Sequence, residues 1–87
     1  MRQWEDAMRS PQVFYVLLDA NKRSQSRVAE AVRALPGVVE VHAVTGDYSL
    51  VIKVTADDVE TSCRKFCKEV KELPGVRQVK SLIPTAP

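Results

Sequence analysis

Few residues in this chain combine the types and spacing that chemistry at a protein site requires. Cys63 and Cys67 lie four positions apart in a segment with helical periodicity, so we expect them to share one helix face. A metal or redox site is one interpretation, but a CxxxC pair with one distant histidine, His42, lacks the paired spacing of zinc motifs. We favour the alternative, in which two reduced cysteines pack as small apolar groups.

No catalytic set emerges from the rest of the sequence. The chain has no nucleophile elbow, no glycine-rich phosphate loop and no pair of histidine ligands. Its single histidine, His42, lies in the middle of a strand-like run, where such residues are usually structural or solvated. We therefore predict that the protein is not an enzyme and holds no cofactor or metal.

The composition is that of one small globular domain. The chain has 87 residues, 45% of them hydrophobic and 28% charged, and a net charge of +2. Basic and acidic residues are interleaved, so we predict no direct binding of nucleic acid. The longest apolar run, residues 13–18, is too short to span a membrane, and the acids Glu5 and Asp6 argue against a signal peptide. We expect a cytoplasmic protein.

The periodicity of apolar residues predicts alternating strands and helices. Strands are expected at residues 12–20, 38–45, 48–55 and 76–83, and helices at residues 25–35 and 56–73. Ser24 is the expected N-cap of the first helix, and Thr55 with Asp58 forms a capping box for the second. Gly46 and Asp47 separate the two middle strands, which predicts a two-residue hairpin turn of type II′.

The tetrapeptide Leu-Pro-Gly-Val occurs twice, at residues 35–38 and 73–76, each time between a helix and a strand. The repeat indicates two βαβ-like halves. Their natural closure is a ferredoxin-like βαββαβ fold of the α+β class, a four-stranded antiparallel sheet with two helices on one face. We place this domain at residues 12–84, after an N-terminal extension at residues 1–11 and before a tail at residues 85–87.

The first strand is apolar on both of its faces, although the two helices can cover only one face of the sheet. Such continuous hydrophobic runs are typical of strands buried on both sides. We therefore predict a homodimer that forms through the sheet, because each apolar side chain that it buries contributes roughly 1.5 to 3 kcal/mol. The residues expected at this interface are Phe14, Val16, Leu18 and Val51. The alternative is that residues 1–11 fold over the second face.

Residues 43–54, Ala-Val-Thr-Gly-Asp-Tyr-Ser-Leu-Val-Ile-Lys-Val, resemble the hairpin motif of the regulation-of-amino-acid-metabolism (RAM) domain. This is the C-terminal effector and assembly domain of Lrp/AsnC transcription regulators, and the resemblance extends over residues 13–83. It implies dimers that join through their sheets and assemble into an octamer or similar ring, with amino-acid effectors bound where dimers meet. The ligand-binding positions it implies are Thr45, Gly46, Asp47, Tyr48, Ser49 and Ser81.

The resemblance also implies how an effector would be held. Backbone donors near Gly46 would take its carboxylate, and Asp47 its ammonium group. From spacing alone, Gly46-Asp47 is also simply a good hairpin turn. The chain departs from the family in three ways: Ser49 stands where an acid often follows the aromatic residue, Val79 and Ser81 stand where two threonines are usual, and only about eleven residues precede the first strand.

We interpret the chain as a stand-alone RAM-like module that binds a small effector, expected to be an amino acid, and acts in transcriptional or metabolic regulation without its own DNA-binding domain. A DNA-binding Lrp/AsnC paralogue is a candidate partner in mixed oligomers. Two alternatives stay open: an ACT-like regulatory domain, and a small dimeric α+β barrel enzyme. The barrel enzyme needs a roomy pocket between helices and sheet, whereas the apolar stripes of the helices predict a filled core.

Overall fold

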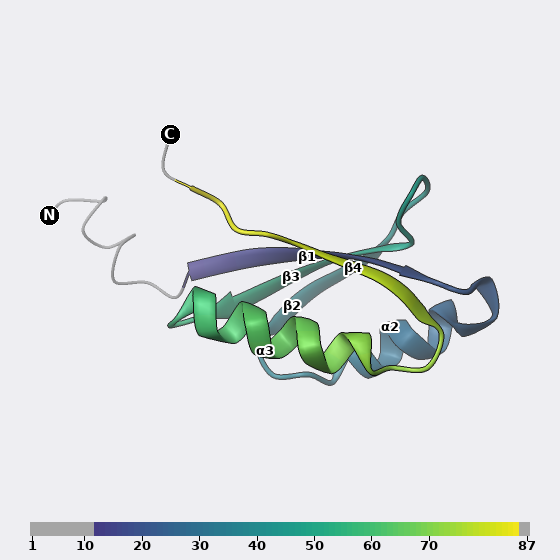
Figure 1. Ribbon diagram of the computed structural model, residues 1–87, viewed down its shortest axis with the longest axis horizontal. Helices are drawn as coiled ribbons and strands as arrows, with labels where there is room; N and C mark the ends of the chain where they lie inside the picture. The colour runs from purple at the N-terminus through teal and green to yellow at the C-terminus, as the bar shows by residue number, and fades with distance from the viewer. Residues whose placement is uncertain (1–11, 86–87) are drawn as a thin grey trace, which may run out of the picture.

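The computed structural model describes residues 12–85, so the expected N-terminal extension at residues 1–11 lies outside the described residues. The elements follow one another in the expected βαββαβ order (Figure 1). They are β1 (Gln12–Ala20), the 3-10 turn η1 (Lys22–Ser24), α2 (Gln25–Arg33), β2 (Val38–Ala43), β3 (Leu50–Ala56), α3 (Val59–Lys71) and β4 (Val76–Leu82).

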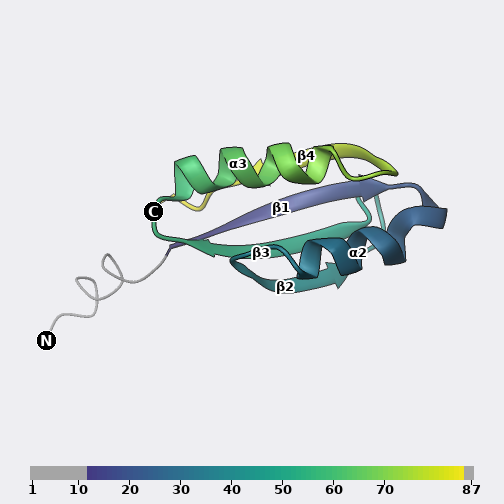
Figure 2. The same cartoon turned by 90° about the horizontal axis from the view of Figure 1, so that it is seen from below.

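The four strands form one antiparallel sheet in the order β2-β3-β1-β4. Helices α2 and α3 lie side by side over the same face of this sheet (Figure 2). Helix α2 packs against β2, and α3 packs against β4 and β1. The predicted α+β, ferredoxin-like arrangement of two helices on a four-stranded antiparallel sheet is confirmed. No helix within residues 12–85 is long and apolar enough to cross a membrane.

Two details of the predicted elements are corrected. Helix α3 begins at Val59 rather than residue 56, because the side chain of Asp58 is itself the N-cap and accepts a hydrogen bond from the Thr61 backbone N–H at 3.2 Å. The hairpin between β2 and β3 is longer than a two-residue turn: the strands end at Ala43 and resume at Leu50, which leaves a loop of residues 44–49.

The side chains of β1 alternate between the two faces of the sheet. Phe14, Val16 and Leu18 point toward the helices and are completely buried. Residues of β3 and of both helices complete this core, among them Leu50, Ile52, Val54, Val28, Val32, Phe66 and Val70. The centre of the layer between helices and sheet is therefore filled, as the apolar stripes of the helices predict.

The assignment of Phe14, Val16 and Leu18 to a dimer interface is therefore wrong. Their exposed fraction is zero within a single chain, because its own helices cover them. Val51, the fourth residue of that assignment, lies on the opposite face of the sheet, where it pairs with Leu17. Its role at an interface stays a prediction.

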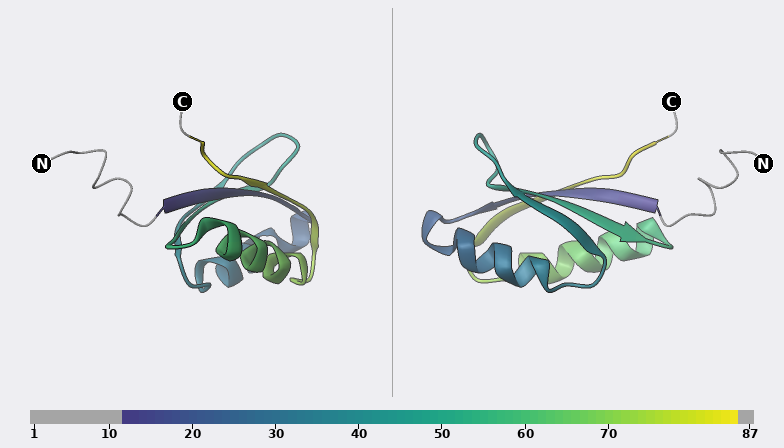
Figure 3. Two further views of the ribbon diagram at one scale, coloured as in Figure 1. Left: turned by 60° about the vertical axis from the view of Figure 1, so that its left-hand side comes forward. Right: turned by 180° about the vertical axis from the view of Figure 1, so that it is seen from behind.

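The face of the sheet that the helices do not cover is here called the open face. Its centre consists of the half-buried residues Val13, Tyr15 and Leu17 on β1 and Val51 and Lys53 on β3. Figure 3 shows the twisted sheet from two further sides, with both helices below it and the β2–β3 hairpin rising on the side away from the helices. This face is apolar, as the sequence predicted, but the apolar side chains of β1 that form it are those of the odd-numbered residues.

Candidate functional site

The loop of residues 44–49 stands out from the packed layers of the structure. Figures 1 and 3 show it projecting from the end of the β2–β3 hairpin, away from the helices. Thr45, Gly46 and Asp47 are exposed, and Tyr48 is half-buried. Gly46 has a φ of +121°, a conformation that favours glycine, and nothing lies within 4 Å of where a Cβ would be. Its backbone is therefore accessible to a ligand.

Backbone hydrogen bonds close the loop at its base. The Val44 N–H donates to the carbonyl of Ser49 at 2.9 Å, and the Ser49 N–H donates to the carbonyl of Leu18 on β1 at 2.8 Å. The second bond continues the β1–β3 ladder by one step beyond Leu50. The loop is therefore fixed at residues 44 and 49, and the four residues between them form its tip.

Ser49 lies beneath the tip and not in it. It is buried, with an exposed fraction of 6%, and its hydroxyl donates to Asp19 Oδ1 at 2.8 Å. The same hydroxyl oxygen accepts the Ala20 N–H at 3.3 Å. The other carboxylate oxygen of Asp19 forms an ion pair with Arg77 on β4 at 3.0 Å. Neither Asp19 nor Arg77 was singled out from the sequence, because contacts between residues so far apart leave no local pattern.

Ser81 is not brought to the loop within one chain. It lies on the edge strand β4, in register with Val16, so its side chain is on the helix side of the sheet. There it reaches Cys67 on α3. Of the predicted ligand positions, the structure thus groups Thr45, Gly46, Asp47 and Tyr48 at the tip, sets Ser49 below them, and places Ser81 elsewhere.

A cavity of about 310 Å³ lies beside the base of the loop. Ala43 and Leu50, the residues that flank the loop, form one wall, and helix α2 forms the other. The helix contributes Gln25, Ser26, Ala29, Glu30 and Arg33. Glu30 and Arg33 bring a carboxylate and a guanidinium to this wall, which is suitable for a small molecule with charges of both signs. The sequence interpretation missed these residues, although their place on the polar face of α2 was a usable signal.

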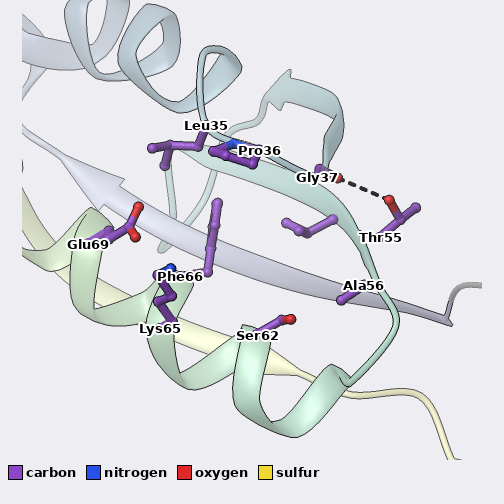
Figure 4. Close-up of a pocket in the computed structure, with 10 residues that line it drawn as sticks. Leu35, Pro36, Gly37, Thr55, Ala56, Ser62, Lys65, Phe66 and Glu69 are labelled. Atoms are coloured by element: carbon purple, nitrogen blue, oxygen red, sulfur yellow. Dashed lines mark hydrogen bonds between the residues drawn. The ribbon is translucent and has the colours of Figure 1, made fainter.

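A second cavity, of about 250 Å³, lies at the opposite end of the hairpin (Figure 4). Phe66 extends from α3 toward Leu35 and Pro36, and Lys65 and Glu69 lie along the same helix. The Gly37 carbonyl accepts the Thr55 N–H at 2.8 Å, which closes the adjoining turn. None of the residues predicted to bind a ligand lines either cavity.

Charged residues border the open face along β2. Glu40 contacts His42 at 2.9 Å and Lys53 at 3.4 Å. The hydrogen bond with His42, followed by the effects of Lys53, holds the pKa of Glu40 below its usual value. Of the two roles that the sequence leaves open for His42, structural or solvated, the structure supports the solvated one, since 62% of its side chain is exposed. This border is polar, and Lys53 extends its charge into the otherwise apolar centre of the open face.

The two cysteines lie on α3, Cys63 buried and Cys67 half-buried, and both are free thiols. Burial, followed by the proximity of Cys63, raises the pKa of Cys67 to about 11. A thiol in this state is neither a reactive nucleophile nor a ready metal ligand. Within the described residues, no group of three or more His, Cys, Asp or Glu side chains could hold a metal ion.

A family model, the Lrp/AsnC ligand binding domain, matches residues 13–85 of this chain. Among curated proteins, the uncharacterized HTH-type transcriptional regulator PH1916 of Pyrococcus horikoshii is 37% identical over 60 residues, which cover 69% of this chain and 40% of the relative. The HTH-type transcriptional regulator FL11 of the same organism is 29% identical over 69 residues, 79% of this chain and 45% of the relative. This chain thus spans less than half the length of either relative.

Solved structures share the fold. TTHA0845 from Thermus thermophilus has a TM-score of 0.78 at 30% identity, over 87% of this chain and 95% of that chain. AsnC of E. coli has a TM-score of 0.76 at 14% identity, over 94% of this chain and 56% of that chain. The likeness to AsnC concerns the fold alone, because the identity is so low.

Proposed function

The chain belongs to the Lrp/AsnC ligand-binding domain family, and from this membership and its exposed loop we propose that it binds a small effector, an amino acid or a close analogue, and assembles with copies of itself. Its role on this proposal is regulatory and not catalytic, in keeping with a family defined by ligand binding. The names of the relatives, HTH-type transcriptional regulators, indicate transcription as the process that it serves.

The observation that carries the proposal is the exposed loop tip, residues 45–48, held out from the packed layers above a cavity that Ala43 and Leu50 line at the base of the loop. Backbone N–H groups beside Gly46 suit the carboxylate of an amino acid, and the exposed carboxylate of Asp47 suits its ammonium group. The half-buried ring of Tyr48 offers apolar surface for a side chain. The cavity beside the base of the loop has a volume of about 310 Å³, which is at the lower end of the range for small-molecule sites.

Ser81 enters this proposal only through assembly. Its side chain lies on the helix side of the sheet, apart from the loop of its own chain, so it can contribute to an effector site only from a second copy. Ser49 is buried beneath the tip, and its hydroxyl is bonded to Asp19 instead. The proposed contacts within one chain are therefore those of Thr45, Gly46, Asp47 and Tyr48.

We propose that the open face is the dimer interface. Tyr15, Leu17 and Val51 form a continuous apolar centre that no described element covers, and Leu82 beside it is 44% exposed. A two-fold dimer that brings two such faces together buries the same residues in both copies. Further assembly of dimers into an octamer or similar ring, and mixed assembly with a DNA-binding relative, extend this proposal.

A ligand screen with paired variants tests the proposal. The melting temperature of the protein is measured with each of the twenty amino acids, and each hit is titrated by calorimetry. One or a few amino acids should raise the melting temperature, and Asp47→Asn should weaken their binding by about tenfold or more, because an ammonium group loses its charged partner. The matched control is Asp57→Asn, which removes an equally exposed acid at the opposite end of β3.

Binding that Asp47→Asn reduces and Asp57→Asn leaves unchanged supports the loop as the site. If no amino acid changes the melting temperature or gives a heat of binding, the effector part of the proposal is wrong. If an amino acid binds but both variants bind it as the wild type does, the loop is not its site. Light scattering on the same samples tests the assembly part independently.

A further inference from the structure

One carboxylate connects strands β1 and β4 to the proposed effector loop. Asp19 is the penultimate residue of β1, and only 16% of its side chain is exposed. Its Oδ1 accepts the hydroxyl proton of Ser49 at 2.8 Å, and its Oδ2 pairs with Arg77 on β4 at 3.0 Å. The loop is thus linked through Asp19 to the strand on the far side of β1.

The proton of the Ser49 hydroxyl is taken up by these contacts. A serine hydroxyl has one proton to donate, and the nearer acceptor is Asp19 Oδ1 at 2.8 Å, against 3.4 Å for the Ala20 carbonyl. The oxygen also accepts the Ala20 N–H at 3.3 Å. No proton remains for a ligand, so this side chain cannot donate a hydrogen bond to an effector without first giving up its bond to a carboxylate.

We propose that Asp19 is a positioning residue for the effector loop, acting through Ser49. It does not contact the effector. It fixes residue 49, and with it the backbone bonds by which Ser49 accepts the Val44 N–H and donates to Leu18. Those bonds set the direction in which residues 45–48 leave the sheet. The Asp19 carboxylate therefore determines where the loop presents its backbone N–H groups to the effector. This inference rests on the function proposed above.

Arg77 completes the arrangement. A carboxylate with so little exposure is costly without a counter-charge, and the guanidinium supplies it from the more exposed side, where 59% of the Arg77 side chain is accessible. The hydrogen bond from Ser49 is charge-assisted, and such bonds are stronger than those between neutral groups. The loop is therefore anchored by the strongest class of hydrogen bond that a serine can make.

Hydrogen exchange and effector affinity test the inference together. The amides of Val44 and Ser49 donate the two closing bonds, so their exchange rates report on the loop base, and the amides of α3 report on global unfolding. Ser49→Ala and Asp19→Ala should accelerate exchange at the two loop amides by about tenfold or more, with α3 changed much less. Both variants should weaken effector binding by a similar factor.

Conservative variants serve as controls. Ser49→Thr keeps a hydroxyl and should restore slow exchange and affinity, and Asp19→Asn keeps an acceptor of the same shape and should fall between the wild type and Asp19→Ala. Asp57→Asn, an exposed acid remote from the loop, should change neither measurement. If Ser49→Ala or Asp19→Ala raises exchange in α3 as much as in the loop, their role is general stability and the inference is wrong.

The two proposals fail in different ways. If no amino acid binds the wild type, the proposed function falls, while the exchange rates at Val44 and Ser49 still decide whether Asp19 anchors the loop. If an amino acid binds the wild type and Ser49→Ala equally well, the positioning role is overturned, whether or not the loop exchanges faster, and the proposed function stands.

Discussion

Phe14 and Phe66 meet edge to face between β1 and α3, with ring centroids 5.9 Å apart and ring planes at 73°. Both rings are buried, with exposed fractions of 0% and 6%. The pair fixes the helix α3 against the sheet, and it explains why Phe14 belongs to the core of a single chain and not to a contact between chains. Edge-to-face pairs of this kind add about 0.5 to 1.5 kcal/mol to the energy of area burial.

Truncation of this pair should destabilise the protein without a specific effect on assembly. Phe66→Ala is expected to lower the free energy of unfolding by about 3 to 5 kcal/mol, since it removes a buried ring and leaves a cavity, and Phe66→Leu by less. Urea denaturation at one fixed protein concentration measures both, because association also stabilises the folded state. A loss below about 1 kcal/mol for Phe66→Ala would contradict this packing.

The order of elements could be predicted from the sequence because local patterns encode it. The two Leu-Pro-Gly-Val segments place the starts of β2 and β4 correctly, whereas both helices end two residues before the predicted positions 35 and 73, at Arg33 and Lys71. The face of β1 that meets the helices was harder to choose, because both alternating sets of side chains are apolar. One signal was present: the set that contains Tyr15 also contains Asp19, and a carboxylate belongs on the less buried face.

The site was only partly predictable. The exposed tip at Gly46 and Asp47 follows from a local motif, so it was found. The role of Ser49 was not, because its partner Asp19 is 30 positions away in sequence and the contact exists only once β1 and β3 are paired. Residues 44, 45, 48 and 49 also have side chains compatible with strands, which made the loop look like a two-residue turn.

A positive charge at the centre of the open face should prevent self-association. Val51→Lys places an ammonium group between Leu17 and the equivalent apolar surface of a second copy, where burial without a partner is costly. We expect the variant to be monomeric under conditions in which the wild type is dimeric or larger, by sedimentation velocity at micromolar concentration. Val39→Lys is the matched control, because Val39 is 53% exposed and lies in a bulge of the edge strand β2. A wild type that is itself monomeric would rule out the interface.

Two glycines with positive φ should respond differently to alanine. At Gly37, with a φ of +87°, a Cβ would lie 2.7 Å from the carbonyl oxygen of Thr55, whereas at Gly46 it would meet nothing. Backbone strain of about 1 to 3 kcal/mol applies at both positions, but only Gly37→Ala adds a collision with backbone. In urea denaturation Gly37→Ala should be the more destabilising of the two, and Gly46→Ala should mainly weaken effector binding. If Gly37→Ala and Gly46→Ala lose the same stability, the exposed loop does not relax around the added methyl group and the predicted difference is wrong.

The N-cap of α3 should make stability depend on acid pH. The hydrogen bond from the Thr61 N–H, followed by that from the Thr61 hydroxyl, lowers the pKa of Asp58 from its usual value of 3.8. A carboxyl whose pKa is lower in the folded state stabilises that state above its unfolded pKa, and the benefit is lost as pH falls through the folded pKa. Relative to Asp58→Asn, the wild type should therefore be more stable at pH 6, and the difference should shrink below about pH 4. A difference that is constant from pH 6 to pH 2 would contradict this origin.

The thiol of Cys67 should be slow to react in the folded protein. Burial and the neighbouring Cys63 raise its pKa to about 11, so at pH 8 only on the order of 0.1% of it is thiolate, the form that reacts with iodoacetamide. In the unfolded chain a cysteine has a pKa of about 8.5, so alkylation in urea at pH 8 should be faster by on the order of a hundredfold. Tandem mass spectrometry separates Cys67 from Cys63 within the same peptide. Rapid alkylation of Cys67 in the native protein at pH 8 would contradict the raised pKa. It would mean that α3 opens locally and exposes this thiol to solvent.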